Sequence, residues 1–286
     1  MKSDEIHSVV KQHFKIIDKL FHRIIIDFDP DDILEFRIEI KKLRSFLHLV
    51  NMQFTKGYEF RITKKLKTFY GYAGIIRNLQ LHLKNIHNYC EELTLSVPKS
   101  YVSKIEREIQ YWKINTKSFM NWDNNFHSDE EIMLSELPKK ITKSSVKKLL
   151  QYTFYELDIL LKHQDDDEVL HSIRKFLQDV AYNLPAIHYY SISVPEALGE
   201  EKNILSCIEQ LEIFRDKCID LVLLKTYFDE SFAMDEKKLL QEIEHQWQGE
   251  KQDLRKKIYD CLKSLQLTHG NINSFMPDLY VEQPGA

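Results

Sequence analysis

The fold of this protein follows from residues 29–52, which read DPDDILEFRIEIKKLRSFLHLVNM. Apolar side chains recur along this stretch at steps of three, four, three, four and three residues, as on the buried face of a helix in a bundle. Asp29 and Pro30 begin it, because proline cannot continue a preceding helix and aspartate favours a new helix N-terminus. The stretch therefore predicts a helix from about Asp32 to Met52. Its apolar positions are Ile33, Phe36, Ile40, Leu43, Leu47 and Val50.

Residues 35–41 also alternate between polar and apolar side chains, which is typical of a strand. The alternation covers only these seven residues, whereas the helical spacing covers eighteen, from Ile33 to Val50. We therefore expect a helix here.

The same spacing predicts helices along most of the chain. They are expected at about Ile6–Phe28, Tyr58–Ile86, Lys99–Phe119, Ser144–His163, Asp166–Tyr190, Ala197–Phe228 and Asp235–Leu267. Asn121–Pro138 is polar and is predicted to be a loop. Seven Gly and seven Pro in 286 residues are too few for a fold with many turns. We expect one all-α domain over residues 1–275, followed by a flexible tail over 276–286.

Composition excludes several classes of protein. A formal charge of −4 argues against a uniformly basic nucleic-acid binder, and no sequence-specific nucleic-acid binding is expected. No apolar run is long enough for a membrane helix, and the first residues are amphipathic, unlike a secretory signal. Neither GxGxxG nor GxxxxGK[ST] occurs. The four cysteines are widely spaced, which favours free thiols and a cytoplasmic location.

A weak internal repeat relates Ile33–Lys84 to Leu170–Leu221. In both copies the apolar stripe follows an acidic turn. The repeat predicts that the domain has two halves, at about 1–140 and 141–275. Ile76-Arg77-Asn78-Leu79 approximately matches Cys218-Ile219-Asp220-Leu221. Charge separates the copies: residues 33–84 hold eleven Lys and Arg against three acidic residues, a net of +8, whereas 170–221 hold five against eight, a net of −3.

A row of basic residues lies beside the first stripe. Arg37, Lys41, Arg44 and His48 stand at i, i+4, i+7 and i+11 and share one helical face. Like charges in a row repel one another, so an anion or protein carboxylates must neutralise them. Such a row could clasp a chain of phosphates, or it could be a solvated face paired with acids elsewhere.

Residues 29–45 resemble the signature helix of CHAD domains, the conserved-histidine α-helical domains. That signature has a His, an Arg three residues later, a basic pair and another Arg. Gly74-Ile75-Ile76-Arg77-Asn78-Leu79 is similar to the later Arg-Asp helix of the family, and Leu170-His171-Ser172-Ile173-Arg174 to its second His-x-x-Arg copy. The resemblance spans about Val9 to Phe228.

The resemblance implies two antiparallel helical bundles related by pseudo-twofold symmetry. It also implies a non-enzymatic module that binds inorganic polyphosphate or a similar polyanion, without a cofactor, in the cytoplasm or on polyphosphate granules. Together with the basic row, it gives the candidate binding residues Arg37, Lys41, Lys42, Arg44, His48, Arg77, His171 and Arg174.

The chain departs from this signature at several positions. Leu34 replaces the first His and Asn78 the usual Asp, while Gln178, Asp179 and Ala181 replace basic residues of the second copy. The alternative is therefore a degenerate scaffold that has lost the polyanion site and binds protein partners. Acidic side chains of the second half would then oppose a phosphate chain, namely Glu200, Glu201, Glu209 and Glu212.

Two other groups of residues fall short of a functional site. His82, His87 and Cys90 invite a metal site, but no fourth ligand has a recognisable spacing. Arg37-Ile38-Glu39-Ile40-Lys41 approaches the Glu-x-Glu-x-Lys motif of CYTH-type triphosphatases, yet Arg stands where the first Glu must bind metal. Neither catalysis nor a bound metal is expected.

Overall fold

The computed structural model describes residues 1–54, 60–120, 125–163, 165–192 and 201–265. These ranges contain nine helices and, apart from one isolated bridge between Lys2 and Lys140, no β-structure. The helices are α1 (Ser3–Asp27), α2 (Pro30–Asn51), α3 (Lys64–Glu92), α4 (Lys99–Met120), α5 (His127–Glu136), α6 (Lys143–Leu161), α7 (Asp167–Tyr189), α8 (Glu201–Tyr227) and α9 (Met234–Ser264). The predicted tail, 276–286, lies outside the described residues.

Helix α2 forms as residues 29–52 predict. The Asp29 carboxylate accepts hydrogen bonds from the backbone N–H groups of Asp31 and Asp32, at 2.9 and 3.0 Å, and so caps the helix. All six residues of the apolar stripe are buried. The alternating residues 35–41 are helical, because the longer three-four spacing gives α2 a continuous apolar face.

Helix α5 corrects the prediction of a loop over 121–138. Its sequence is too polar to show an apolar stripe, but Phe126 and Met133 bury their side chains as it packs against α1. The buried carboxylate of Asp129 accepts a hydrogen bond from the hydroxyl of Thr63, which also caps α3. These tertiary contacts stabilise a helix that the spacing of apolar residues in its own sequence does not predict.

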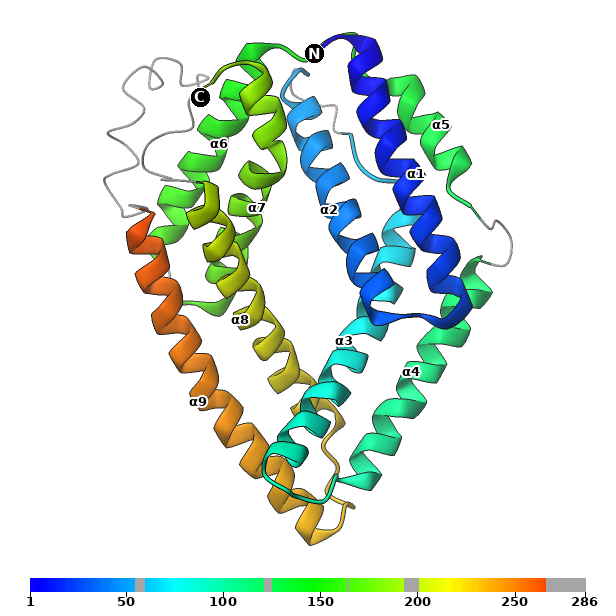
Figure 1. The fold of residues 1–286 in the computed structure, drawn as a ribbon, viewed down its shortest axis with the longest axis vertical. Coiled ribbons are helices and arrows are strands. Elements are labelled where there is room, and N and C mark those ends of the chain that lie inside the picture. The colour runs from blue at the N-terminus through cyan, green and yellow to red at the C-terminus, as the bar shows by residue number, and fades with distance from the viewer. Residues whose placement is uncertain (55–59, 121–124, 164, 193–200, 266–286) are drawn as a thin grey trace, which may run out of the picture.

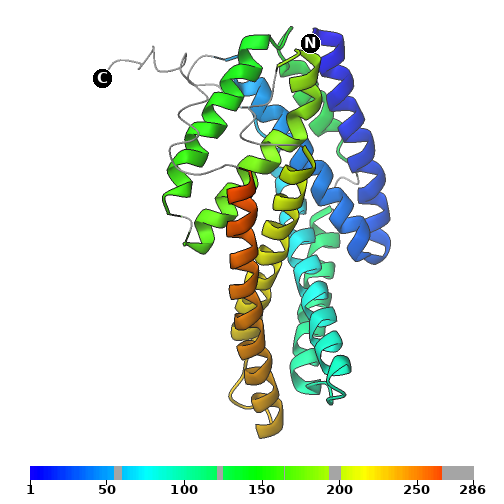
Figure 2. The ribbon, with the colours of Figure 1, turned by 60° about the vertical axis from the view of Figure 1, so that its left-hand side comes forward.

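The helices form two arms (Figure 1). In one half α1 packs on α2 and α3 on α4, and in the other α6 packs on α7 and α8 on α9. Helix α2 contacts α7, and α3 contacts α8, so the arms meet along these inner helices. The pairs α3–α4 and α8–α9 run side by side toward the same end of the molecule (Figure 2). A duplication would produce this order of contacts; the duplication itself stays a prediction.

A polar seam joins α2 to α7. The Nδ2 of the buried Asn183 donates to the Oγ of Ser45 at 2.8 Å and to the carbonyl oxygen of Asp179 at 2.9 Å. The Ser45 hydroxyl in turn donates to that carbonyl at 3.2 Å. Because buried polar groups need partners, these bonds fix how far along each other the two helices lie.

A second buried polar network joins α3, α4 and α8. His82 is fully buried, with Nδ1 2.9 Å from Oδ1 of Asp220 and Nε2 2.7 Å from the hydroxyl oxygen of Tyr101. Asn85 donates to the other oxygen of Asp220 at 2.7 Å. The His82 ring also meets the indole of Trp247 in α9 edge-to-face, with centroids 5.7 Å apart. The network therefore connects both arms.

No helix within the described ranges combines the length and the apolar character needed to cross a membrane.

Candidate functional site

Cationic side chains gather where α2, α3, α7 and α8 meet. We call this group the central cluster. Positive charges from other members of the cluster contribute to lowering the pKa values of five of these side chains, so residues far apart in the sequence share one site. It consists of Arg37 and Lys41 from α2, Arg77 from α3, His171, Arg174 and Lys175 from α7, and Arg215 from α8.

Arg37 is held against α3. Its guanidinium donates from Nη1 to the carbonyl oxygen of Tyr70 at 3.0 Å and lies over the Tyr70 ring, 4.3 Å from the centroid. Gly74 makes this position possible, because a Cβ there would overlap Nη1 and lie 2.8 Å from Cζ of Arg37. Burial lowers the pKa of Arg37, and the charges of Arg215 and Arg77 lower it further.

Lys41 and Arg174 converge on one carboxylate, that of Glu212. The Nζ of Lys41 donates to Oε1 at 2.9 Å, and Nη1 of Arg174 lies 3.6 Å from the same oxygen. Gln178 donates to it as well, at 2.7 Å, and accepts a bond from Arg174 at 3.0 Å. Burial lowers the pKa of both Lys41 and Arg174, although Glu212 opposes this shift.

The cluster holds more positive than negative charge. Six arginine and lysine side chains (Arg37, Lys41, Arg77, Arg174, Lys175 and Arg215) are opposed by three carboxylates, those of Glu212, Asp216 and Glu168, so basic groups exceed acidic groups by three. Asp216 lies 3.2 Å from Nη1 of Arg215, and burial raises its pKa. Nε of Arg174 is buried without a hydrogen-bond partner, which is costly for a charged group.

His171 is surrounded by these cations. Its Nδ1 lies 3.5 Å from Nη2 of Arg174, and Lys175, Arg215 and Lys41 act on it as well. Burial, followed by these positive charges, lowers the pKa of His171 from 6.5 to about 4. The imidazole is therefore neutral at neutral pH and becomes charged only in acid.

The low pKa of His171 predicts a loss of stability in acid. The unfolded chain takes up a proton near pH 6.5 and the folded chain near pH 4, so the free energy of unfolding falls between these values. The fall should amount to about 1–2 kcal/mol, once solvent screening of this half-buried group is allowed for. Urea unfolding at pH 7.5 and pH 4.5 measures it.

The matched comparison uses two substitutions. His171→Gln should remove this part of the pH dependence, whereas His245→Gln, at an exposed histidine of α9, should leave it unchanged. Equal pH dependence in the wild type and in His171→Gln would contradict the assignment.

Three candidate residues of α2 lie outside the central cluster. Lys42 lies 3.4 Å from Glu39, which also contacts His13 of α1, so Lys42 is placed on the α1 side of the helix. His48 lies farther along, with Nδ1 3.1 Å from Oδ2 of Asp179. Arg44 is exposed beside Lys175, with no ion pair in the described part of the chain.

The sequence did not identify Lys175, Arg215 or the supporting Tyr70. One signal in the sequence could have indicated Arg215. It is followed by Asp216, just as Arg77 is followed by Asn78 in the segment that is similar to the Arg-Asp helix. The four acidic residues that were expected to oppose a phosphate chain lie in different surroundings. Glu212 enters the cluster and Glu201 pairs with His188 at 2.9 Å. Glu209 is exposed, and Glu200 lies outside the described residues.

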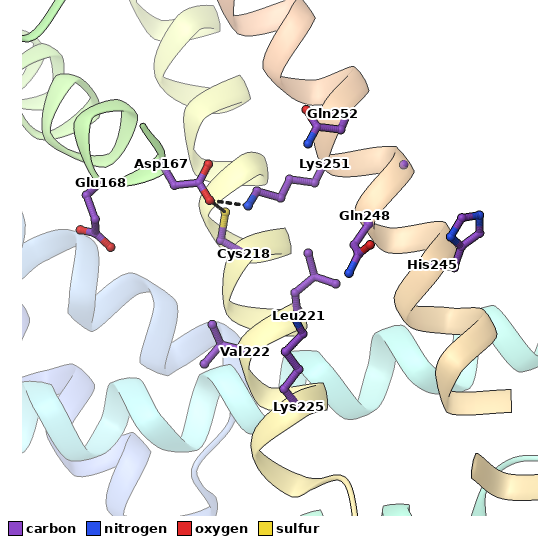
Figure 3. Close-up of a pocket in the computed structure, with 11 residues that line it drawn as sticks. Asp167, Glu168, Cys218, Leu221, Val222, Lys225, His245, Gln248, Lys251 and Gln252 are labelled. Atoms are coloured by element: carbon purple, nitrogen blue, oxygen red, sulfur yellow. Dashed lines mark hydrogen bonds and ion pairs between the residues drawn. The ribbon is translucent and has the colours of Figure 1, made fainter. Parts of the chain in front are cut away.

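A separate hollow of about 630 Å³ opens between α8, α9 and the start of α7 (Figure 3). The Asp167 carboxylate in it contacts Lys251 and Arg255, so its acidic charge is already paired. The Sγ of Cys218 lies 3.9 Å from the same carboxylate. Burial raises the pKa of Cys218 to about 11, which keeps its thiol protonated at neutral pH.

The residues of the candidate metal site are not brought together. His82 belongs to the buried network with Asp220, Cys90 is buried and His87 is exposed. Among the residues that the structure describes, no three His, Cys, Asp or Glu side chains are placed to hold a metal ion. None of the four cysteines forms a disulfide within the described residues, as the sequence predicts.

Two solved structures resemble this one. PptA from Streptomyces chartreusis matches with a TM-score of 0.62 and 14% identity, over 92% of this chain and 99% of that chain. The CHAD domain from the plant Ricinus communis matches with a TM-score of 0.55 and 13% identity, over 99% of this chain and 93% of that chain. No family model and no curated protein matches the sequence.

At these low identities the similarity concerns the fold alone. It covers nearly the whole of each chain, and the expected all-α CHAD-like fold is therefore confirmed.

Proposed function

We propose that this protein is a non-enzymatic module that binds inorganic polyphosphate, or a polyanion of similar charge density, at the central cluster. The observation that carries the proposal is the excess of three basic over acidic side chains at the meeting point of four helices. Holding these cations together is unfavourable, and a linked chain of phosphates relieves the repulsion at several of them at once.

The chemistry of the cluster favours binding over catalysis. Arginine offers planar, bidentate donors that suit phosphate oxygens, and Lys41 and Lys175 add point charges. Two of the carboxylates are already engaged, Glu212 by Lys41 and Asp216 by Arg215. The resemblance of residues 29–45 to the CHAD signature implies the same class of ligand.

Binding is expected to depend steeply on salt. If the three excess cations each neutralise one phosphate, the slope of log K against log salt should be about −2, at roughly −0.7 per phosphate as for single-stranded nucleic acids. Isothermal titration with long-chain polyphosphate between 0.05 and about 0.3 M salt measures this slope, and the proposal fails if it is near zero.

Three variants locate the site. Arg37→Glu/Lys41→Glu should abolish binding at about 0.15 M salt, where distant surface charges are screened. Arg77→Gln/Lys175→Gln removes two cations for which the described residues provide no ion pair, so it should fold normally and weaken binding about tenfold or more. Lys147→Glu/Lys148→Glu is the control for the first variant. It makes the same change of charge on the exposed side of α6, outside the central cluster.

A second candidate function is a scaffold for protein partners. The ion pairs of Glu212 favour it, because this carboxylate already occupies two cations of the cluster. Failure of the folded wild type to bind polyphosphate at any salt concentration would favour this candidate.

A further inference from the structure

Glu212 makes contacts that a phosphate oxygen would make. Its Oε1 accepts hydrogen bonds from Lys41 and Gln178, at 2.9 and 2.7 Å, and lies 3.6 Å from Arg174. These partners come from α2 and α7, whereas Glu212 belongs to α8. One carboxylate oxygen thus stands between the two halves of the cluster.

The exposure of Glu212 also allows its side chain to turn away from Lys41 and Arg174. Its side chain is 43% exposed, whereas those of Lys41 and Arg174 are 20% and 5% exposed. A glutamate that turns outward reaches water without moving the backbone of α8. Lys41 and Arg174 are more deeply buried than Glu212 and are therefore less free to follow it.

We propose that Glu212 is an internal counterion that determines specificity: it occupies the phosphate position when the site is empty and yields only to anions with several linked phosphates. This inference rests on the proposed function and adds the residue that sets the smallest ligand the site accepts. Glu212 also spares Lys41 and Arg174 from standing unpaired in a partly buried site, which would be unfavourable.

The selection follows from the balance of contacts. A single phosphate that displaces Glu212 replaces one anion with another at Lys41 and Arg174, and gains little. A linked chain gains the same contacts and in addition reaches Arg37, Arg77, Lys175 and Arg215 without a further loss of translational freedom. Affinity should therefore rise steeply with the number of phosphates rather than in proportion to it.

The test is Glu212→Gln, which keeps the Oε1 acceptor but removes the charge. The probes are orthophosphate, tripolyphosphate and long-chain polyphosphate, each titrated into the wild type and the variant. The wild type should bind the long chain and should bind tripolyphosphate weakly or not at all. The variant should bind tripolyphosphate at least about tenfold more tightly than the wild type, with a smaller gain for the long chain.

Glu209→Gln is the matched control. Glu209 is exposed on the same helix, three residues earlier, and its substitution changes the net charge by the same amount. Its effect should stay within about twofold for each probe. Thermal unfolding of both variants checks that any change in binding is not a change in folding.

Two results would overturn the inference while the proposed function stands. One is an equal gain in both variants, since Glu212 would then act only through net charge. The other is a gain in Glu212→Gln that is the same for every chain length, since Glu212 would then set no smallest ligand. If neither the wild type nor Glu212→Gln binds any of the three probes, the proposed function fails and the inference fails with it.

Discussion

Replacing His82 with alanine is expected to lower the free energy of unfolding by about 3–5 kcal/mol, because it removes a hydrogen-bond partner from a buried carboxylate and opens a cavity in the core. Asp220 would keep its bond from Asn85 but lose the imidazole 2.9 Å away, and the Tyr101 hydroxyl would keep only its 3.5 Å bond to the carbonyl oxygen of Leu223. The removed side chain also leaves a cavity beside Trp247. Thermal unfolding should show a decrease in Tm of about 10 °C.

His87→Ala is the control for this prediction. His87 lies on the same helix, five residues later, but is exposed. Its substitution should change the free energy of unfolding by no more than about 0.5 kcal/mol. Similar decreases in Tm for the two variants would show that the His82–Asp220–Tyr101 network contributes nothing to stability.

Replacing Gly74 with alanine is expected to weaken polyphosphate binding about tenfold or more without removing any charge. The added Cβ would overlap the Arg37 guanidinium, so this side chain must leave the carbonyl oxygen and ring of Tyr70. Loss of one well-placed charged contact costs roughly 1.5–3 kcal/mol, which corresponds to a tenfold change or more in affinity.

Gly71→Ala provides a close comparison, since Gly71 lies on the same helix and no atom lies within 4 Å of the added Cβ. Alanine should stabilise α3 at this position by roughly 0.5–1 kcal/mol and leave binding unchanged. At Gly74 the same gain in helix propensity is opposed by the displacement of Arg37. If both substitutions stabilise the protein equally and neither weakens polyphosphate binding, the position that Gly74 allows Arg37 to take is not needed for binding.

The helices that bury a continuous apolar face were predictable from the sequence. Helix α2 shows this well, because its own three-four spacing contains the information that its packing uses. Helix α5 was not predictable, because it depends on Phe126, Met133 and the bond between Asp129 and Thr63. Contacts between distant segments leave no periodic trace in the sequence of either segment.

The same distinction applies to the site. Arg37 and Lys41 were identified together because residues four apart share a helical face. Glu212, which lies 171 residues from Lys41, shows no local sign that the two side chains meet. His82 and Asp220 are 138 residues apart, so a histidine considered as a metal ligand proved to be a member of a buried network. Pairings of this kind depend on how α2, α3, α7 and α8 cross.

The seam of Ser45, Asp179 and Asn183 gives that crossing a fixed register. Sliding α7 along α2 by one turn, about 5.4 Å, would break the bonds that the buried Asn183 amide donates to Ser45 and leave it only the carbonyl oxygen of Asp179 within its own helix. The seam includes none of the charged side chains of the central cluster. Evolution can therefore exchange the charges of this crossing one at a time while its geometry persists. A change of charge in the cluster thus leaves intact the frame that positions the remaining side chains.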